Sequence, residues 1–251
     1  MTRTPYQGAL QILRFNRRFY AAAGAMLLAM PLTPAALRWA ILPAILWSCS
    51  SLAVSHYIYD RYPLYRLAWL PRNLSARPRR WLHLHAGLDE IGAMLPSVFP
   101  AAEGCIADFF DPAEMTEPSI HAARALAAAP ASRMDWRSLP FAARSFDAVF
   151  LVFAAHELRR AASRDRLFIE TARVLEPGGE LVLVEHLRDW PNFLAFGPGF
   201  LHFFTARAWC RSAAAAGLEL RRSESLTPFV KLFVFGKVPQ DSRPVQLGSQ
   251  S

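Results

Sequence analysis

The sequence has few cysteines and few charged residues for its length. Only three of its 251 residues are cysteine, and they lie far apart, at Cys49, Cys105 and Cys210. They form neither a disulfide framework nor a zinc-binding pattern, which fits a reducing compartment. Charged residues make up 19% of the chain and hydrophobic residues 53%. This balance excludes a disordered chain, because such a chain cannot bury enough apolar surface to offset the entropy lost on ordering.

Acidic residues are almost absent from the first 80 residues. This part holds 11 arginines and one acid, Asp60, so its net charge is +10. Residues 81–251 hold 17 basic and 19 acidic residues, a net charge of −2. The overall charge of +8 is therefore a property of the N-terminal part alone. This split argues against a nucleic-acid-binding protein, in which basic residues line the domain itself.

The N-terminal part is a long apolar stretch with arginines on both sides. From Phe19 to Tyr59 the only charged residue is Arg38, and the second half of the stretch is long enough to cross a hydrocarbon core of ~30 Å. Positive residues at both ends suit a hairpin whose ends face the cytoplasm. We therefore expect residues 1–62 to form an apolar helical hairpin that anchors the protein in the inner membrane through residues 19–59.

Two other interpretations of this stretch remain open. Its serines and His56 make the second half less lipid-like, so the helices could pack on the rest of the protein as a soluble extension. Arg17–Arg18 followed by Phe19–Met30 also resembles a signal peptide, although a second apolar run follows at once. The next segment, 63–80, is an Arg-rich linker that either contacts anionic lipid headgroups or is simply solvated.

From Trp81 onward, short apolar runs alternate with helical segments. We expect strands at Trp81–His85, Gly104–Ala107, Ser132–Met134, Ala148–Phe153, Leu181–Val184, Leu218–Arg222 and Phe229–Phe235. We expect helices at Ile91–Val98, Pro112–Ala129, Ser163–Leu175 and Thr205–Ala216. This order predicts an α/β domain over residues 81–238, with a Rossmann-like, mostly parallel seven-stranded sheet covered by helices on both faces. The polar tail, residues 239–251, is expected to be disordered.

Three signatures in this domain resemble the class I S-adenosylmethionine-dependent methyltransferases, especially the small-molecule branch that includes quinone methyltransferases. Arg173–Leu181, with its Pro-Gly-Gly sequence, looks like the helix–loop–strand element of that branch. Asp135 followed by Leu139–Phe141, and then Ser145–Val149, matches the segment that leads into the family's fourth strand. The resemblance covers Trp81–Val238. It implies an enzyme that binds S-adenosylmethionine and methylates an apolar or amphipathic small molecule.

The loop after the first strand departs from the family pattern. The family has an acidic residue followed by three alternating glycines, whereas the run from His83 to Asp89 keeps only Gly87. Glycines matter there because the backbone must approach the cofactor closely. The cofactor binds either through a variant loop, with Asp89 or Glu90 replacing the missing carboxylate, or not at all, in which case the domain is a non-catalytic scaffold.

The resemblance implies a set of cofactor-binding residues. Asp108 ends the second strand 21 residues after Gly87, close to the spacing of about 20 at which a carboxylate reaches ribose hydroxyls in dinucleotide-binding folds. By resemblance Asp108 would hold the ribose, while Asp135 and Trp136 would bracket the adenine. The full set is His85, Ala86, Gly87, Asp89, Glu90, Asp108, Asp135 and Trp136.

Two histidine–glutamate pairs follow the central strands. His156 and Glu157 come after the fourth strand, and Glu185 and His186 come at the end of the fifth, so both pairs are expected at the rim where such sheets bind ligands. We predict His156, Glu157 and His186 as catalytic candidates, to act as a base or to orient the acceptor. A structural hydrogen bond is the competing interpretation for each histidine.

No metal site is predicted. His83 and His85 alternate on one strand face and could mimic two metal ligands. No third ligand lies at a recognisable spacing from them.

The segment Trp190–Phe204 is rich in phenylalanine and contains His202, a third position that could serve as a base or orient the acceptor. It lies between the fifth strand and the next helix, where the family often places a substrate lid. It forms either an apolar acceptor pocket facing the membrane segment or a helix pair packed on the sheet. A pocket of this kind would take a lipid, a quinone or a polyketide-like ring.

We therefore predict a methyltransferase at the inner membrane, with its catalytic domain in the cytoplasm. Its partners are the membrane and an apolar or lipid-like substrate, and no nucleic acid. A nucleic-acid methyltransferase is disfavoured because the arginines flank an apolar hairpin, and a dehydrogenase because the three-glycine fingerprint is absent. The scaffold remains the alternative, and the sequence identifies neither the acceptor nor the oligomeric state.

Overall fold

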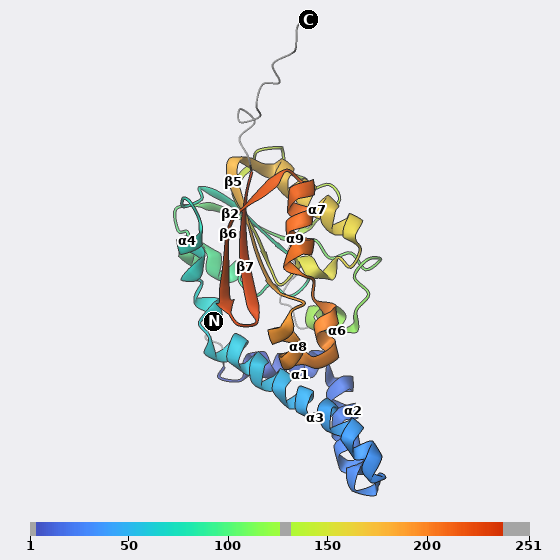
Figure 1. Cartoon of the computed structure of the whole chain (residues 1–251). Coiled ribbons are helices and arrows are strands. Elements are labelled where there is room, and N and C mark those ends of the chain that lie inside the picture. The colour runs from blue at the N-terminus through green and yellow to red at the C-terminus, as the bar shows by residue number, and fades with distance from the viewer. Residues whose placement is uncertain (1–3, 126–131, 238–251) are drawn as a thin grey trace, which may run out of the picture.

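A seven-stranded sheet forms the centre of the domain in the computed structural model, which describes residues 4–125 and 132–237 (Figure 1). The strand order is β3-β2-β1-β4-β5-β7-β6, with β7 antiparallel to both of its neighbours and the other pairs parallel. The strands are β1 (Arg80–His85), β2 (Glu103–Asp108), β3 (Ser132–Arg133), β4 (Phe146–Val152), β5 (Leu175–His186), β6 (Leu218–Thr227) and β7 (Val230–Lys237). The predicted fold is confirmed.

Helices cover both faces of this sheet. The helices are α1 (Gln7–Phe15), α2 (Arg17–Ala29), α3 (Ala35–His56), α4 (Trp69–Asn73), α5 (Leu95–Val98), α6 (Pro118–Arg124), α7 (Ala161–Val174), α8 (Trp190–Phe196) and α9 (Ala206–Ala215). Successive side chains of β4 alternate between the faces: Val149 packs with α7 and α9, and Phe150 packs with α4 and α5. A strand that is buried on both faces has a continuous run of apolar residues, and this run predicted β4 from the sequence.

One predicted helix is much shorter than expected. The alanine-rich composition suggested Pro112–Ala129, but α6 begins only at Pro118 and is described to Arg124. Asp111 sets a separate turn before it, with its carbonyl accepting hydrogen bonds from the N–H groups of Glu114 and Met115. Proline at the start of α6 has no N–H to continue a preceding helix. Residues 126–129 and the tail 239–251 lie outside the described residues.

The N-terminal helices form the predicted hairpin. Figure 1 shows α2 and α3 side by side, running away from the sheet domain, with α1 lying across the domain's lower edge. The far end of the hairpin is exposed and apolar, with Leu32 89% exposed. The other end of α3 packs on α8, where the rings of Trp47 and Phe193 meet edge to face. One helical stretch, Ala35–Arg66, is long and apolar enough to cross a membrane, a criterion that some soluble core helices and signal sequences also meet.

Candidate functional site

The parallel strands β1, β2, β4 and β5 end at one edge of the sheet, and α1 and α6 lie over this rim. A cavity of about 160 Å³ opens there between the N-terminal helices and the strand ends. Its lining includes Phe15 of α1, Gly87 after β1, Ile120 of α6, and His156 and Glu157 after β4. The sheet topology therefore brings the predicted cofactor loop and the first predicted catalytic pair to one place.

The loop after β1 is closed by Asp89. One oxygen of its carboxylate lies 3.1 Å from Nε2 of His83 and accepts hydrogen bonds from the backbone N–H groups of Ile91 and Gly92. Burial acts to raise the pKa of Asp89, but the contact with His83 and the Gly92 N–H outweigh it and lower the pKa to about 2. Glu90 lines the cavity and accepts a hydrogen bond from the Tyr65 hydroxyl. In this arrangement Asp89 binds its own loop.

Asp108 is buried at the end of β2 and is paired with Arg124 of α6. One carboxylate oxygen accepts from the N–H of Phe110, and the other lies 2.8 Å from Nη1 of Arg124. The same Nη1 donates to the carbonyl of Ala86, and the guanidinium stacks over the ring of Phe110. Gly87 has φ +148, and a Cβ there would come 2.4 Å from Cγ of Arg124. Arg124 thus lies directly over the glycine and the carboxylate that the sequence assigned to the cofactor.

His85 is a buried histidine of this site that lacks hydrogen-bond partners within the part of the chain that the structure describes. It is buried next to His83, and neither of its ring nitrogens has a hydrogen-bond partner among the described residues. Burial lowers its pKa, against the opposing charge of Asp89. Buried polar atoms without partners are rare in proteins and point to a bound ligand or water.

Asp135 and Trp136, the two residues predicted to contact the adenine, differ in their exposure. Trp136 is buried in the core, under the guanidinium of Arg137. The Asp135 side chain is 58% exposed and accepts from the N–H of Arg137.

His156 and Glu157 form the centre of a second cluster on the rim. Nδ1 of His156 lies 2.8 Å from Glu185, and its Nε2 lies 3.3 Å from Glu157. His202, from the segment after α8, brings its ring centroid to 5.4 Å from that of His156. Burial opposes the charged form of His156, but the two glutamates outweigh it and raise its pKa to about 10. Burial, aided by His156, lowers the pKa of His202 to about 4.

His186 lies beside this cluster with both ring nitrogens engaged. Nδ1 faces the carbonyl of Phe229 at 2.9 Å, and Nε2 faces the hydroxyl of Tyr59 at 2.8 Å. Its ring stacks between those of Phe153 and Phe203. The three predicted catalytic residues therefore separate: two line the cavity, and His186 stands behind it.

The sequence missed one residue of this site and did not show where another would lie. No sequence pattern identified Arg124 as a site residue, because a sequence does not show that a helix residue packs against Gly87, 37 positions earlier. His202 was one of the positions considered for a base or orienter, but its contact with His156 depends on the path of α8 and the turn that follows.

Comparison with known proteins finds a family match for the middle of the sheet domain. Residues 112–183 match a family model described as a methyltransferase domain. This stretch is similar to a methyltransferase domain. The match supports S-adenosylmethionine as the cofactor of this domain, and supports the class I resemblance seen in the sequence.

A curated relative also supports a similarity to methyltransferases. The chain is 35% identical over 117 residues to a demethylmenaquinone methyltransferase from Thermus thermophilus. The match covers 45% of this chain, and the chain spans about half of that relative, 49% of its length.

Solved structures confirm the fold of the methyltransferase domain. The PH0226 protein from Pyrococcus horikoshii has a TM-score of 0.53 at 16% identity, covering 71% of this chain and 91% of the other. The [4+2]-cyclase SpnF has a TM-score of 0.52 at 18% identity, covering 72% and 82%. An S-adenosylmethionine-dependent methyltransferase from Methanosarcina mazei has a TM-score of 0.50 at 18% identity, covering 68% and 98%. At these identities the likeness concerns the fold alone.

The residues of the methyltransferase domain fit S-adenosylmethionine in their chemistry. Asp108 offers a buried carboxylate, Gly87 allows close backbone approach, and the two ring nitrogens of His85 lack partners within residues 4–125 and 132–237. The side chain of Arg124 covers Gly87 and Asp108 and has to move aside for a ligand to reach them.

Proposed function

We propose that this protein is a membrane-associated methyltransferase that uses S-adenosylmethionine to methylate an apolar or amphipathic small molecule. The observation that carries the proposal is the cavity on the rim, which places the strand-end loops of a methyltransferase domain against the apolar N-terminal helices. The demethylmenaquinone methyltransferase relative supports an acceptor of the quinone class, a ring with a long apolar tail.

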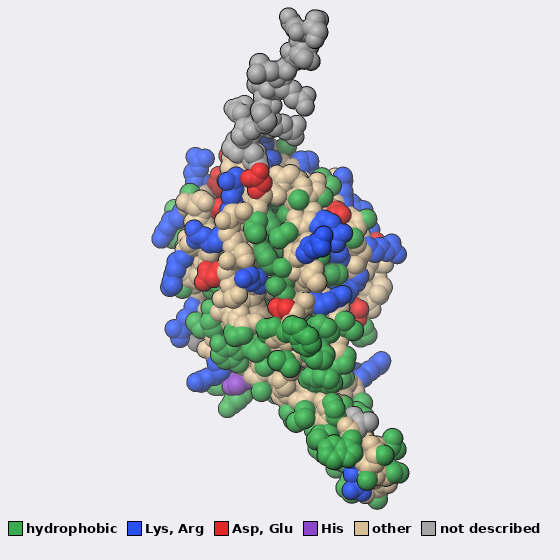
Figure 2. Space-filling model, viewed as in Figure 1, with side chains coloured by type: hydrophobic (Ala, Val, Ile, Leu, Met, Phe, Trp, Pro, Cys, Tyr) green, Lys and Arg blue, Asp and Glu red, His purple; other side chains and the backbone are tan. Residues whose placement is uncertain are grey.

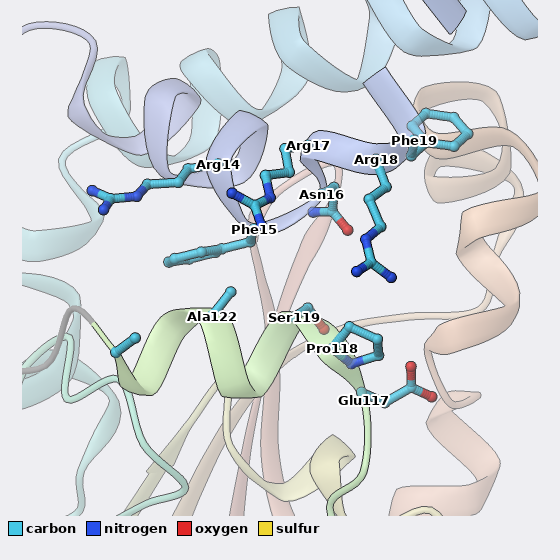
Figure 3. Close-up of a pocket in the computed structure, with 11 residues that line it drawn as sticks. Arg14, Phe15, Asn16, Arg17, Arg18, Phe19, Glu117, Pro118, Ser119 and Ala122 are labelled. Atoms are coloured by element: carbon cyan, nitrogen blue, oxygen red, sulfur yellow. The ribbon is translucent and has the colours of Figure 1, made fainter. Parts of the chain in front are cut away.

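The acceptor reaches the rim from the side of the N-terminal helices. A cleft of about 540 Å³ lies between the α1–α2 junction and α6, and it shares Phe15, Asn16 and Ser119 with the rim cavity. Figure 3 shows Arg14, Arg17 and Arg18 on one side of this cleft, with Arg18 extending towards α6. Arginines beside an apolar hairpin suit the boundary between lipid headgroups and acyl chains.

Each part of the rim has its own task in this proposal. S-adenosylmethionine, when bound, supplies an electrophilic methyl group, so the protein mainly has to orient two molecules and exclude water. Asp108, Gly87 and His85 hold the cofactor. Glu157, whose Oε2 has no hydrogen-bond partner among the described residues, faces the cavity and orients a polar group of the acceptor. His186 positions the aromatic wall behind the cavity.

Membrane association is supported by the surface. Figure 2 shows hydrophobic side chains gathered over α8 and along the α2–α3 hairpin, while Lys and Arg side chains are spread over the rest of that face. Trp190 at the start of α8 is 74% exposed, and Leu194 is exposed one turn later. An exposed apolar patch that joins the hairpin to the domain indicates an interaction site rather than ordinary surface. We propose the inner membrane as the location, with the methyltransferase domain on its cytoplasmic side.

The first test is cofactor binding by the full chain in detergent. Calorimetry should show one bound S-adenosylmethionine per chain, and Asp108→Asn should weaken binding at least tenfold. Glu219→Gln, which changes an exposed carboxylate on β6, is the matched control and should bind normally. Absence of binding by folded protein would overturn the proposal.

The second test is turnover. Labelled methyl groups from S-adenosylmethionine should enter products extracted into organic solvent from membranes that contain demethylated quinones. No transfer despite tight cofactor binding would favour the non-catalytic scaffold, an alternative supported by the Arg124–Asp108 ion pair.

A further inference from the structure

We infer that His156, Glu157 and His202 form a binding site for a divalent transition-metal ion, with Zn²⁺ as the ion of best fit. One ligand atom from each of these side chains lies within 4.8 Å of the other two. They come from two separate segments, one after β4 and one after α8, which the fold brings together at the rim cavity.

The spacing of the first two ligands already matches a zinc site. Nε2 of His156 and Oε1 of Glu157 lie 3.3 Å apart. Ligand atoms about 2.0–2.1 Å from a tetrahedral Zn²⁺ stand about 3.3 Å from one another. Since all three ligand atoms lie within 4.8 Å of one another, that of His202 has to approach by at most about 1.5 Å to complete the triangle, which a change of side-chain torsion can supply.

Glu185 prepares His156 for an ion. Its carboxylate contacts Nδ1 of His156 at 2.8 Å and also accepts from the backbone N–H of the same residue. The ring therefore presents Nε2 to Glu157 and the cavity, and an ion bound there would replace the proton that the raised pKa of His156 keeps on the ring. Histidines that bind metals typically donate their other ring N–H to a carboxylate, which fixes the tautomer and the orientation of the ring.

Glu157 supplies an independent indication that something binds here. The residue is only 7% exposed, and its Oε2 has no hydrogen-bond partner among the described residues. A buried carboxylate oxygen without a partner is costly, and an ion held by Oε1 would give Oε2 a partner, either the ion itself or its bound water.

The donor set selects the type of ion. Two imidazole nitrogens and one carboxylate oxygen suit Zn²⁺ and other first-row divalent ions, whereas Mg²⁺ and Ca²⁺ prefer oxygen ligands alone. Three protein ligands leave an open coordination position, as in catalytic rather than structural zinc sites. That position faces the rim cavity, where a water molecule or an oxygen of a small ligand would complete the coordination.

The test uses the full chain, purified in detergent, stripped with a chelator and free of any affinity tag. Zn²⁺ titrated in competition with a chromophoric chelator should bind one ion per chain. Substitution of the same site by Co²⁺ should give the visible absorption of a tetrahedral nitrogen–oxygen site. Absence of stoichiometric Zn²⁺ binding by folded protein would overturn the proposal.

Matched variants locate the ion. Glu157→Gln and His202→Ala should each weaken Zn²⁺ binding at least tenfold, and Glu185→Gln about 10- to 100-fold, as for other residues that orient metal ligands. His121→Ala removes an exposed histidine of α6 and should leave the affinity unchanged. Circular dichroism checks that every variant is folded. Equal Zn²⁺ affinity in all of them would place the ion elsewhere and overturn the assignment. Ion binding is measured without cofactor or acceptor, so its failure is separate from that of methyl transfer.

Discussion

The hydroxyl of Tyr59 lies 2.8 Å from Nε2 of His186 and ties the N-terminal helical segment to the end of β5. Because Nδ1 of the same ring faces the Phe229 carbonyl, the imidazole donates there and accepts from the tyrosine. Burial lowers the pKa of His186 to about 4, so the ring is neutral near pH 7 and can keep both bonds. A neutral histidine thus joins the hairpin to the methyltransferase domain.

Tyr59→Phe should loosen this junction. The change leaves a buried ring nitrogen without a partner, and we expect the free energy of unfolding to fall by about 1–3 kcal/mol. Urea unfolding in detergent micelles measures it. Tyr57→Phe removes a hydroxyl from a tyrosine that is exposed. If Tyr57→Phe lowers the free energy of unfolding as much as Tyr59→Phe does, the contact with His186 does not stabilise the protein.

Asp89 should make the stability of the protein depend on acid pH. The folded protein holds the pKa of this carboxyl at about 2, below its ordinary value of 3.8. The ionised form therefore stabilises the fold above about pH 4, and this contribution is lost as the pH falls from about 4 towards 2. Asp89→Asn should lower the free energy of unfolding at pH 6 by on the order of 2 kcal/mol and flatten its decline in acid.

Asp135→Asn is the control for this experiment, because that carboxylate is largely exposed. Denaturant unfolding at several pH values from 3 to 6 gives both curves. If Asp89→Asn and the unchanged protein decline in parallel, the contact with His83 does not hold the carboxylate in its charged form.

Arg124 should compete with the cofactor. The side chain of Arg124 lies against Gly87, and its guanidinium pairs with Asp108. Arg124→Ala should therefore bind S-adenosylmethionine several-fold more tightly. The same change leaves a buried carboxylate unpaired and should destabilise the ligand-free protein by about 3 kcal/mol. Calorimetry and thermal unfolding measure the two effects. Weaker binding would instead make Arg124 a direct contact of the cofactor.

The exposed apolar side chains of α8 should contribute to membrane binding. Trp190→Ser combined with Leu194→Ser removes two of them, and we expect at least a fivefold loss of binding to vesicles of anionic and zwitterionic lipid, from the apolar area withdrawn from contact. Flotation of the full chain with vesicles is the measurement. Leu220→Ser, on the exposed part of β6, is the control and should float normally. Equal flotation of all three proteins would confine membrane contact to the hairpin.

The sequence predicted the existence of all seven strands, since the buried part of a strand is a short apolar run, but β5 spans Leu175–His186 where only Leu181–Val184 was expected. Ala148–Phe153 was expected and β4 spans Phe146–Val152. It predicted α6 poorly, because alanine-rich composition favours a helix anywhere and only the Asp111 turn and Pro118 fix where this one begins. Local spacing also predicted that His156 and Glu157 lie on the rim.

Contacts across the fold were beyond such reasoning. The positions of Arg124 over the cofactor loop and of His202 beside His156 depend on how helices pack, and helix packing leaves no fixed spacing in a sequence. The same holds for His186: its strand-end position was right, but its two hydrogen bonds come from Tyr59 and from the β6–β7 turn.

Asp60, the single acid among the first 80 residues, accepts hydrogen bonds from the N–H groups of Gly8 and Ala9 at the start of α1, and it also contacts His56 at the end of α3. Gly8 permits this contact, because a Cβ there would collide with Tyr59. One carboxylate thus connects α1, which lines the rim cavity, to the C-terminal end of α3. A change in the position of α3 would therefore be passed to α1 through a single side chain, and with α1 one wall of the rim cavity would shift.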